Sequence, residues 1–533
     1  MNIMSQGNMG KVKFILSFFL MISMLAAVGC DGKKDDTDSK SKPVANSSSE
    51  NISTEPVAGE FSYEETVISA EKTVKEYNPK GNTANLSNPI KGYKDAAAES
   101  LRKEIINTEN TEKYYKITGQ RYYVSSLNGD DSNDGTSPDK PFKSIEALRD
   151  LKFKPGDAVL FQRGSLFRIG TTFLASKGVI YGSYGSGEKP KIYGSPMNLV
   201  NLEWTPSVKK NVWQFDYTYS ECASMIFNHG EAIGYKKTSL KLLKKNTDFY
   251  LDPSSLTMYV YCDEGNPARI YKSIDVATRL SIINIPSGVT DVTIDNLCLK
   301  YAGMFGVSGT WDTSNINITN CEIGYMGGAT HDDGTTRYGN AVQFWTGAEN
   351  IKCDHNWIYQ TFDTAVTWQG YGAEKFRYEN ILFSNNLLEY NNGDFEFWDD
   401  KSTVKNFNIK GNILRFTSLG WGTRADDGGW RGIDGCFVGD IEEMNISNLK
   451  IQNNIIDSPG RVIMSLRISN KDFNKNVLFS GLEVYVNSSL RTSNEVIRGL
   501  PSGNDFISVI AKDKVTFAEG LKKYDSKAVL EWK

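Results

Sequence analysis

Three short segments near the middle of the chain alternate apolar and polar residues, and they carry amide, carboxylate and indole side chains. They are AVQFW (341–345), AVTWQ (365–369) and FEFWD (395–399). Alternate residues of a strand point to opposite faces, so one face should receive the polar and aromatic side chains. That set is Gln343, Trp345, Thr367, Gln369, Glu396 and Trp398. Flat rings that stack on sugars and polar groups that bind hydroxyls are what a carbohydrate-binding face requires.

The same stretch holds carboxylates that could act as an acid and a base. Asp363 and Asp394 follow the starts of their repeats by 12 (363−351) and 13 (394−381) residues, which suggests equivalent places on adjacent coils. Carboxylates roughly 5 Å apart suit a retaining glycosidase, and roughly 6.5–9.5 Å suits an inverting one. Close like charges raise one pKa, which keeps a general acid protonated. We predict Asp363, Asp394 and Glu396 as the acid/base group, with Asp399 in reserve. Turn formation at Asp394 and strand capping at Asp399 are the alternatives.

Two long insertions flank these segments, at 327–340 (GGATHDDGTTRYGN) and 419–435 (LGWGTRADDGGWRGIDG). Long loops on a regular scaffold usually serve function, often as the walls of a groove. The predicted substrate contacts are therefore Gln343, Trp345, Trp398, His331, Asp333, Arg424 and Trp430. Asp426 and Asp427 are oxygen ligands that could bind Ca²⁺. Neither loop has a metal motif of fixed spacing, and an aspartate–arginine pair could instead stiffen a solvated loop.

All these residues depend on a scaffold that repeats itself. Six segments share apolar first, third and eighth positions: VTIDNLCL (292–299), INITNCEI (316–323), IKCDHNWI (351–358), ILFSNNLL (381–388), FNIKGNIL (407–414) and LKIQNNII (449–456). Each copy has Asn at the fifth or sixth position, and Asn tolerates the left-handed backbone of a sharp bend. Repeats of this size with variable insertions predict a solenoid. Short alternating segments, without 3.6-residue spacing, favour an all-β, right-handed, single-stranded parallel β-helix.

Residues 121–194 carry a family resemblance. RYYVSSLNGDDSNDGTSPDKPFKSIEAL, followed by FKPGDAVLFQRGSLFRI, resembles the opening of bacterial secreted β-helix proteins of the pectate-lyase-like superfamily. DFYLDPSSLTMYVYCDEGNPARIY resembles a small β insertion found in several β-helix carbohydrate-active enzymes. The resemblance implies a parallel β-helix that acts on a glycan. Lyases of this superfamily hold Ca²⁺ against a uronate while Arg abstracts the α-proton, but the chain lacks their characteristic Lys/Arg signature.

The N-terminus has the features of an export signal. Lys11 and Lys13 precede an apolar run of 15 residues (14–28), which is short for a membrane span and ends before Cys30. Small residues before this Cys and a polar stretch after it resemble a bacterial lipobox. The resemblance implies a lipid anchor on Cys30 and an outward-facing protein at the bacterial cell membrane. An ordinary cleaved signal peptide is the alternative.

Length and composition suit one long solenoid, since 533 residues with 39% hydrophobic content can bury a large core. The six cysteines after Cys30 have no CxxC spacing and are expected to be small buried hydrophobes. The predicted parts are a signal peptide (1–29), a disordered tether (30–60), a helical N-terminal segment or cap (61–118), the start of the β-helix (119–194), an inserted β-hairpin module (195–280), coils with the active groove (281–515) and a C-terminal cap (516–533).

The net charge of −4 gives no basic balance, which argues against a nucleic-acid partner. The preferred hypothesis is a monomeric, surface-anchored glycoside hydrolase that needs no cofactor and degrades a polysaccharide or oligosaccharide. A Ca²⁺-assisted polysaccharide lyase and a non-catalytic, adhesin-like glycan-binding β-helix are the alternatives. β-Helices serve all three classes, so the fold does not choose between them.

Overall fold

The structure is a computed structural model that describes residues 93–332, 334–370, 376–398, 403–423, 435–439, 445–457 and 459, and six short strands between 462 and 532. The predicted signal peptide, tether and most of the C-terminal cap lie outside the described residues. So do seven of the predicted site residues: Cys30, Asp333, Asp399, Arg424, Asp426, Asp427 and Trp430.

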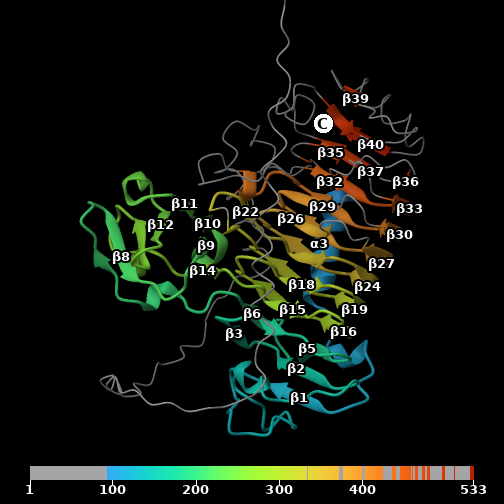
Figure 1. The fold of residues 1–533 in the computed structure, drawn as a ribbon, viewed down its shortest axis with the longest axis horizontal. Coiled ribbons are helices and arrows are strands. Elements are labelled where there is room, and N and C mark those ends of the chain that lie inside the picture. The colour runs from blue at the N-terminus through green and yellow to red at the C-terminus, as the bar shows by residue number, and fades with distance from the viewer. Residues whose placement is uncertain are drawn as a thin grey trace, which may run out of the picture.

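Three ten-stranded sheets, each built from strands of successive coils, form the body of the protein (Figure 1). The first sheet has the order β1 (Arg121–Val124), β2 (Ala158–Gln162), β5 (Ile180–Tyr184), β16 (Thr290–Asp295), β19 (Thr313–Thr319), β24 (Ala348–Asp354), β27 (Arg377–Ser384), β30 (Thr403–Lys410), β33 (Asn445–Gln452) and β36 (Lys471–Asn474). The second has β4 (Phe173–Leu174), β15 (Ile283–Ile285), β18 (Val307–Thr310), β23 (Val342–Trp345), β26 (Thr364–Gln369), β29 (Gly393–Trp398), β32 (Gly435–Gly439), β35 (Val462–Ser465), β38 (Glu495–Arg498) and β39 (Val509–Ile510). The third has β3 (Leu166–Arg168), β6 (Lys191–Tyr193), β17 (Cys298–Lys300), β20 (Glu322–Gly324), β25 (Trp357–Tyr359), β28 (Leu387–Glu389), β31 (Ile413–Arg415), β34 (Ile455–Asp457), β37 (Val477–Ser480) and β40 (Val529–Trp532). Strands pair in parallel throughout, except β38 with β39, so the predicted parallel β-helix is confirmed.

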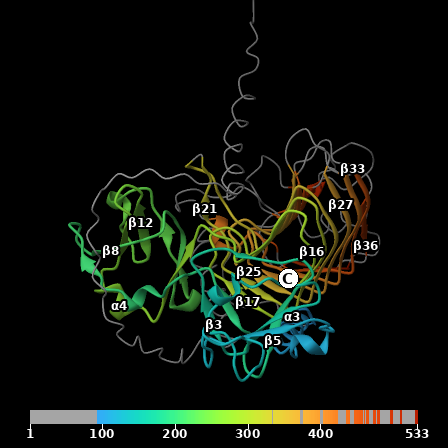
Figure 2. The same cartoon turned by 60° about the horizontal axis from the view of Figure 1, so that its bottom comes forward.

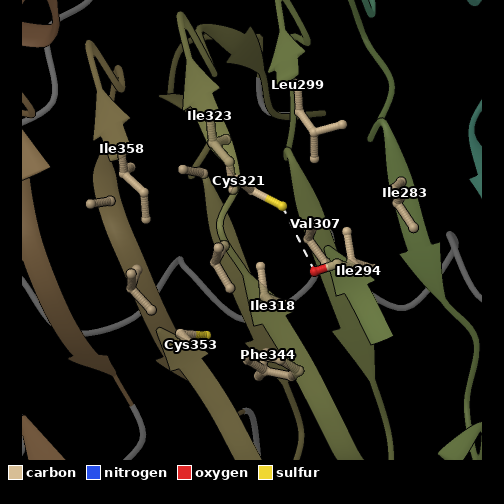
Figure 3. Close-up of a cluster of buried hydrophobic side chains, with 14 of the residues drawn as sticks. Ile283, Ile294, Leu299, Val307, Ile318, Cys321, Ile323, Phe344, Cys353 and Ile358 are labelled. Atoms are coloured by element: carbon tan, nitrogen blue, oxygen red, sulfur yellow. Dashed lines mark hydrogen bonds between the residues drawn. The ribbon is translucent and has the colours of Figure 1, made fainter. Parts of the chain in front are cut away.

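The predicted repeat register is also confirmed. The first apolar position forms one column across the first sheet: Val292, Ile316, Ile351, Ile381, Phe407 and Leu449. Figure 3 shows how such columns stack, with Ile294, Ile318 and Cys353 in line on neighbouring strands. Burying like side chains over like removes one continuous strip of apolar surface from water. All six described cysteines are buried, as expected, and none forms a disulfide with another described cysteine.

The asparagines at the corner after each first-sheet strand divide into two roles. The residue at the sharp bend has a left-handed backbone conformation in all six coils. It is an asparagine in four of them (Asn296, Asn320, Asn385 and Asn453), and His355 and Gly411 take this place in the other two. The residue after the bend is a buried Asn in four coils: Asn356, Asn386, Asn412 and Asn454. The first three donate their backbone N–H to the side-chain oxygen of the next Asn at 2.8–2.9 Å. Asn is therefore present for this buried ladder as well as for the bend.

A smaller β unit lies between β6 and β15 in sequence and beside the solenoid in space (Figure 1, Figure 2). One of its sheets has the order β10 (Ala232–Ile233), β9 (Cys222–Phe227), β14 (Ile274–Thr278). The other has β11 (Tyr235–Lys236), β12 (Asp248–Asp252), β13 (Thr257–Tyr261), β8 (Val212–Asp216) and β7 (Thr205–Pro206). Ile226 and Ile233 pack with Tyr301 and Tyr325 of the solenoid, so this unit covers part of the outer side of the third sheet.

Helix α3 (Tyr93–Ile106) covers another part of that outer side. Ala98 and Ile105 pack in the same cluster as Trp357 and Leu387, and Arg102 pairs with Glu389 of β28. The predicted N-terminal segment therefore contains a helix, and the apolar residues of this helix meet the outer side of the third sheet. Within the part of the chain that the structure describes, no helix has the length and hydrophobicity to cross a membrane.

Candidate functional site

The predicted face of the second sheet has the expected register. Val342, Val366 and Phe395 form one buried column, and Phe344, Trp368 and Phe397 form the next. The alternate residues of the same strands form two outward columns. Gln343, Thr367 and Glu396 lie between the two buried columns, and Trp345, Gln369 and Trp398 follow the second one. We call these six residues the polar face. Strands about 4.8 Å apart bring their side chains within hydrogen-bonding reach of one another.

Glu396 is held within this face by its neighbours on the preceding coil. Its Oε2 atom accepts hydrogen bonds from the Thr367 hydroxyl at 2.8 Å and the Gln369 amide at 2.6 Å. Only 1% of Glu396 is exposed, whereas Trp398 is 47% exposed. The face therefore combines an enclosed carboxylate with an exposed indole at the end of the same strand.

Neutral polar groups extend the face toward the earlier coils. Asn284, two coils before Gln343, donates to the hydroxyl of Ser308, one coil before it, at 2.8 Å. The Asn340 amide donates to Gln343 Oε1 at 2.9 Å, and its oxygen accepts from the N–H and hydroxyl of Thr364. The second-sheet strands β15, β18, β23, β26, β29 and β32 contain no Lys or Arg. On these strands the donors to Glu396 come from the preceding coil, whereas its register partner on the next coil is the apolar Val438.

Asp394 does not lie on the polar face, contrary to prediction. It is fully buried near the start of β29, where the Thr417 hydroxyl donates to Oδ2 and the Asn391 amide donates to Oδ1 at 3.3 Å. Its register neighbour Cys436 belongs to the central core. Burial raises the pKa of Asp394 to about 7, although the hydrogen bonds from Thr417 and Asn391 lower it. Asp394 is therefore an interior carboxyl that does not meet Glu396.

Asp363 is not equivalent to Asp394 either. Thr364 pairs with Gly393, so Asp363 lies level with Asn392, two residues before the level of Asp394. Thr367 pairs with Glu396, which puts Asp363 four residues, or about 13 Å of strand, away from the level of Glu396. Asp363 is buried, its N–H donates to Gly339 O and its carbonyl accepts from Gly393. The predicted cluster of three carboxylates is therefore spread out.

His331 belongs to a hairpin anchored to the smaller β unit. The hairpin strands are β21 (Ala329–Thr330) and β22 (Arg337–Tyr338), and the His331 ring stacks on Tyr338 at 3.9 Å. The Thr330 N–H donates to Glu221 at 2.8 Å. The buried Arg337 guanidinium lies over the Phe362 ring at 4.4 Å. These contacts fix the hairpin but do not bring His331 to the polar face.

Sequence reasoning missed Trp311. This residue follows β18, is 36% exposed, and donates its N–H to Trp345 O at 3.0 Å. Its ring meets Phe376 edge to face at 5.6 Å. The preceding strand VSGT lacks the apolar alternation of the other copies, so only the pairing of Thr310 with Trp345 reveals it. No group of three or more potential metal ligands occurs among the residues that the structure describes.

Comparisons with known proteins give a partial likeness. No protein-family model matches the chain. A lacto-N-biosidase of Bifidobacterium longum subsp. longum is 25% identical over 191 residues, which cover 34% of this chain and 12% of that protein. The chain thus spans about an eighth of the length of this relative.

Among solved structures, the GH136 lacto-N-biosidase from Eubacterium ramulus is similar with a TM-score of 0.31 and 15% identity, over 69% of this chain and 65% of that one. A rhamnogalacturonan lyase is similar with a TM-score of 0.37 and 11% identity, over 68% and 74% of the two chains. These values leave the chemistry of this chain to be argued from its own residues.

Proposed function

We propose that the protein is a carbohydrate-active enzyme that hydrolyses glycosidic bonds at the polar face. The observation that carries the proposal is Glu396, a buried carboxylate that accepts from Thr367 and Gln369 and lies two residues from the exposed ring of Trp398. Indole rings bind the apolar faces of sugars, and a nearby carboxylate can act on the anomeric carbon. The partial likeness to a protein named lacto-N-biosidase supports a glycan as the substrate.

Hydrolysis requires two groups in complementary protonation states. A new bond forms between water or a carboxylate and the anomeric carbon, the bond to the leaving oxygen breaks, and that oxygen receives a proton. Glu396 is our candidate for one group. Asp363 lies about 13 Å along the strand from the level of Glu396, an offset that an aspartate side chain cannot span. Asp399, Asp426 and Asp427 are candidates from sequence and lie outside the described residues.

Elimination on a uronate-containing glycan is the alternative reaction. Elimination on a uronate needs a cation against the carboxylate and a base for the α-proton. A Ca²⁺ site at Asp426 and Asp427 would supply the cation, so elimination is retained as an outcome to be tested. Ca²⁺ is not required for the proposed hydrolysis.

A panel of neutral and uronate-containing glycans tests the reaction type. We expect new reducing ends without the ultraviolet absorbance of an unsaturated uronate. An absorbing product that disappears with a chelator would replace hydrolysis by elimination. Binding without any product would indicate the adhesin-like alternative.

We also propose that Cys30 carries a lipid that holds the protein at the bacterial cell membrane, facing outward. The motif at residues 27–30 and the apolar run before it support this location. Exchange of Cys30→Ser should move the protein from the membrane pellet to the soluble fraction of cells. An unchanged distribution between pellet and soluble fraction would contradict the anchor.

A further inference from the structure

Thr367 and Gln369 approach Glu396 from one coil. Thr367 is the register partner of Glu396, and Gln369 is the partner of Trp398 two residues further along the strand. Both side chains point outward, and both donate to the same oxygen, Oε2, at 2.8 and 2.6 Å. This arrangement follows from strand periodicity, because residues two apart on β26 share a face with Glu396.

The backbone of Gln369 is itself held in place. Its carbonyl oxygen accepts from the Tyr378 hydroxyl, and also from the Thr346 N–H at 2.8 Å. Thr367 is fully buried, so its hydroxyl has no access to bulk water. The two donors are therefore fixed at the end of β26 before any substrate binds, which is the condition for preorganised electrostatic stabilisation.

We propose that Thr367 and Gln369 are positioning residues that hold Oε2 of Glu396 and favour its ionised form against the opposing effect of burial, which assigns Glu396 the role of base or nucleophile and not of acid. This inference rests on the proposed hydrolase function. Two donors on one oxygen stabilise the charged carboxylate more than the neutral acid. As a base, Glu396 takes the proton of the attacking water. As a nucleophile, it bonds to the anomeric carbon. In both cases the leaving oxygen takes its proton from a different residue.

The test is the pH dependence of kcat/KM in the variants Thr367→Val and Gln369→Met of the full chain, with the glycan cleaved best in the panel as substrate. Loss of one charge-assisted hydrogen bond should move the acidic limb of the profile upward by about 1 pH unit. KM should change little. Thr367→Ser restores the hydroxyl and should restore the wild-type limb.

A matched control is available in the first sheet. The Thr319 hydroxyl donates to the buried carboxyl of Asp295 at 2.8 Å, on strands β19 and β16 of the first sheet, whereas the polar face belongs to the second sheet. Thr319→Val removes the same kind of bond and should leave the acidic limb of the profile unchanged. A shift in this control equal to that of Thr367→Val would indicate a general loss of stability and would overturn the positioning role.

Glu396→Gln separates this inference from the proposed function. If that variant is inactive while Thr367→Val and Gln369→Met keep the wild-type limb, the positioning role is wrong and the hydrolase site stands. If Glu396→Gln is fully active, the proposed site is wrong and the inference falls with it. If Thr367→Val fails to fold, the pH profile of Gln369→Met tests the inference independently.

Discussion

Glu389 and Glu396 lie seven residues apart (396−389) on one coil, and both point outward, but their surroundings differ. Glu389 ends β28 in the third sheet, where Arg102 and Arg415 pair with Oε1 and the Trp357 indole donates to Oε2 at 2.9 Å. Burial raises the pKa of Glu389, but the two arginine charges outweigh it, so the pKa is lowered. Glu396 in the second sheet has two neutral donors among its described partners.

The third sheet repeats this ionic pattern along its length. The outward residues at its strand ends are Arg168, Tyr193, Lys300, Gly324, Tyr359, Glu389, Arg415 and Asp457. Arg168 pairs with Asp275 of the smaller β unit at 2.7 Å, and Arg102 of α3 pairs with Glu389. Charges on the third sheet therefore attach the elements that cover it. The comparison teaches that a carboxylate paired with arginines from two elements, as Glu389 is, serves assembly, whereas Glu396 accepts from two donors of a single neighbouring strand.

The largest expected effect is on turnover, from Glu396→Gln. A catalytic carboxylate contributes about 10²–10⁴-fold in rate, so hydrolysis should fall by that factor. The thermal midpoint should hardly change, because the Gln oxygen can accept from Thr367 and Gln369 as the carboxylate does. Initial rates and thermal melts measure both quantities. An active but destabilised variant would make Glu396 a structural residue like Glu389.

Glu389→Gln should have the opposite effect, on stability and not on turnover. The substitution leaves the buried guanidinium of Arg102 beside a neutral amide in place of a carboxylate. Breaking a buried ion pair in this way costs about 3–5 kcal/mol of stability. Denaturant unfolding measures the change. The exposed Glu349–Arg377 pair is the control, since Glu349→Gln should cost under about 1 kcal/mol. Equal small losses in the two variants would contradict the structural role of the third-sheet network.

Asp394 predicts a pH dependence of stability. Its pKa is about 7 in the folded protein, against about 3.9 in an unfolded chain. The folded state thus holds the proton more tightly, so this contribution is complete below about pH 4 and is lost as pH rises through about 7. Thermal midpoints at pH 5 and pH 8 should differ less in Asp394→Asn than in the native chain. Loss of hydrolysis in this variant, with its fold intact, would return Asp394 to the catalytic group.

The smallest effect is expected for Trp398→Ala. If the exposed ring stacks on a sugar, its loss should weaken binding by about 1–3 kcal/mol, or about 5–150-fold in Kd. Calorimetric titration with a cleavable glycan and Glu396→Gln as background measures this loss. Leu174→Ala is the control, because Leu174 is exposed on β4 of the same sheet several coils away. An equal loss in both variants would remove Trp398 from the site.

Much of the scaffold is determined locally and was accessible from the sequence. Apolar residues at alternating positions, repeated with a left-handed bend between them, specify which side chains enter the core. This is why the columns from Val292 to Leu449, and those containing Gln343, Thr367 and Glu396, appear in the predicted register. The sequence also contains the outward column of the third sheet, because each of its members from Lys300 to Asp457 directly follows an eight-residue repeat. The repeat does not indicate which elements cover this column.

The tertiary structure decided which carboxylates share a face. The corner between β25 and β26 has four residues (360–363), and that between β28 and β29 has three (390–392). This one-residue difference adds to the one-residue difference in distance from the repeat starts (12 and 13), so Asp363 and Asp394 lie at levels two residues apart. Asp394 is thereby buried near the start of β29 beside Thr417, which precedes β32 in the next coil. Corner length depends on how each loop packs in three dimensions, so counting from the repeat start does not reveal it. The same is true of the partners of Glu389 and Glu396, because Arg102 and Gln369 reach them only after the coils have stacked.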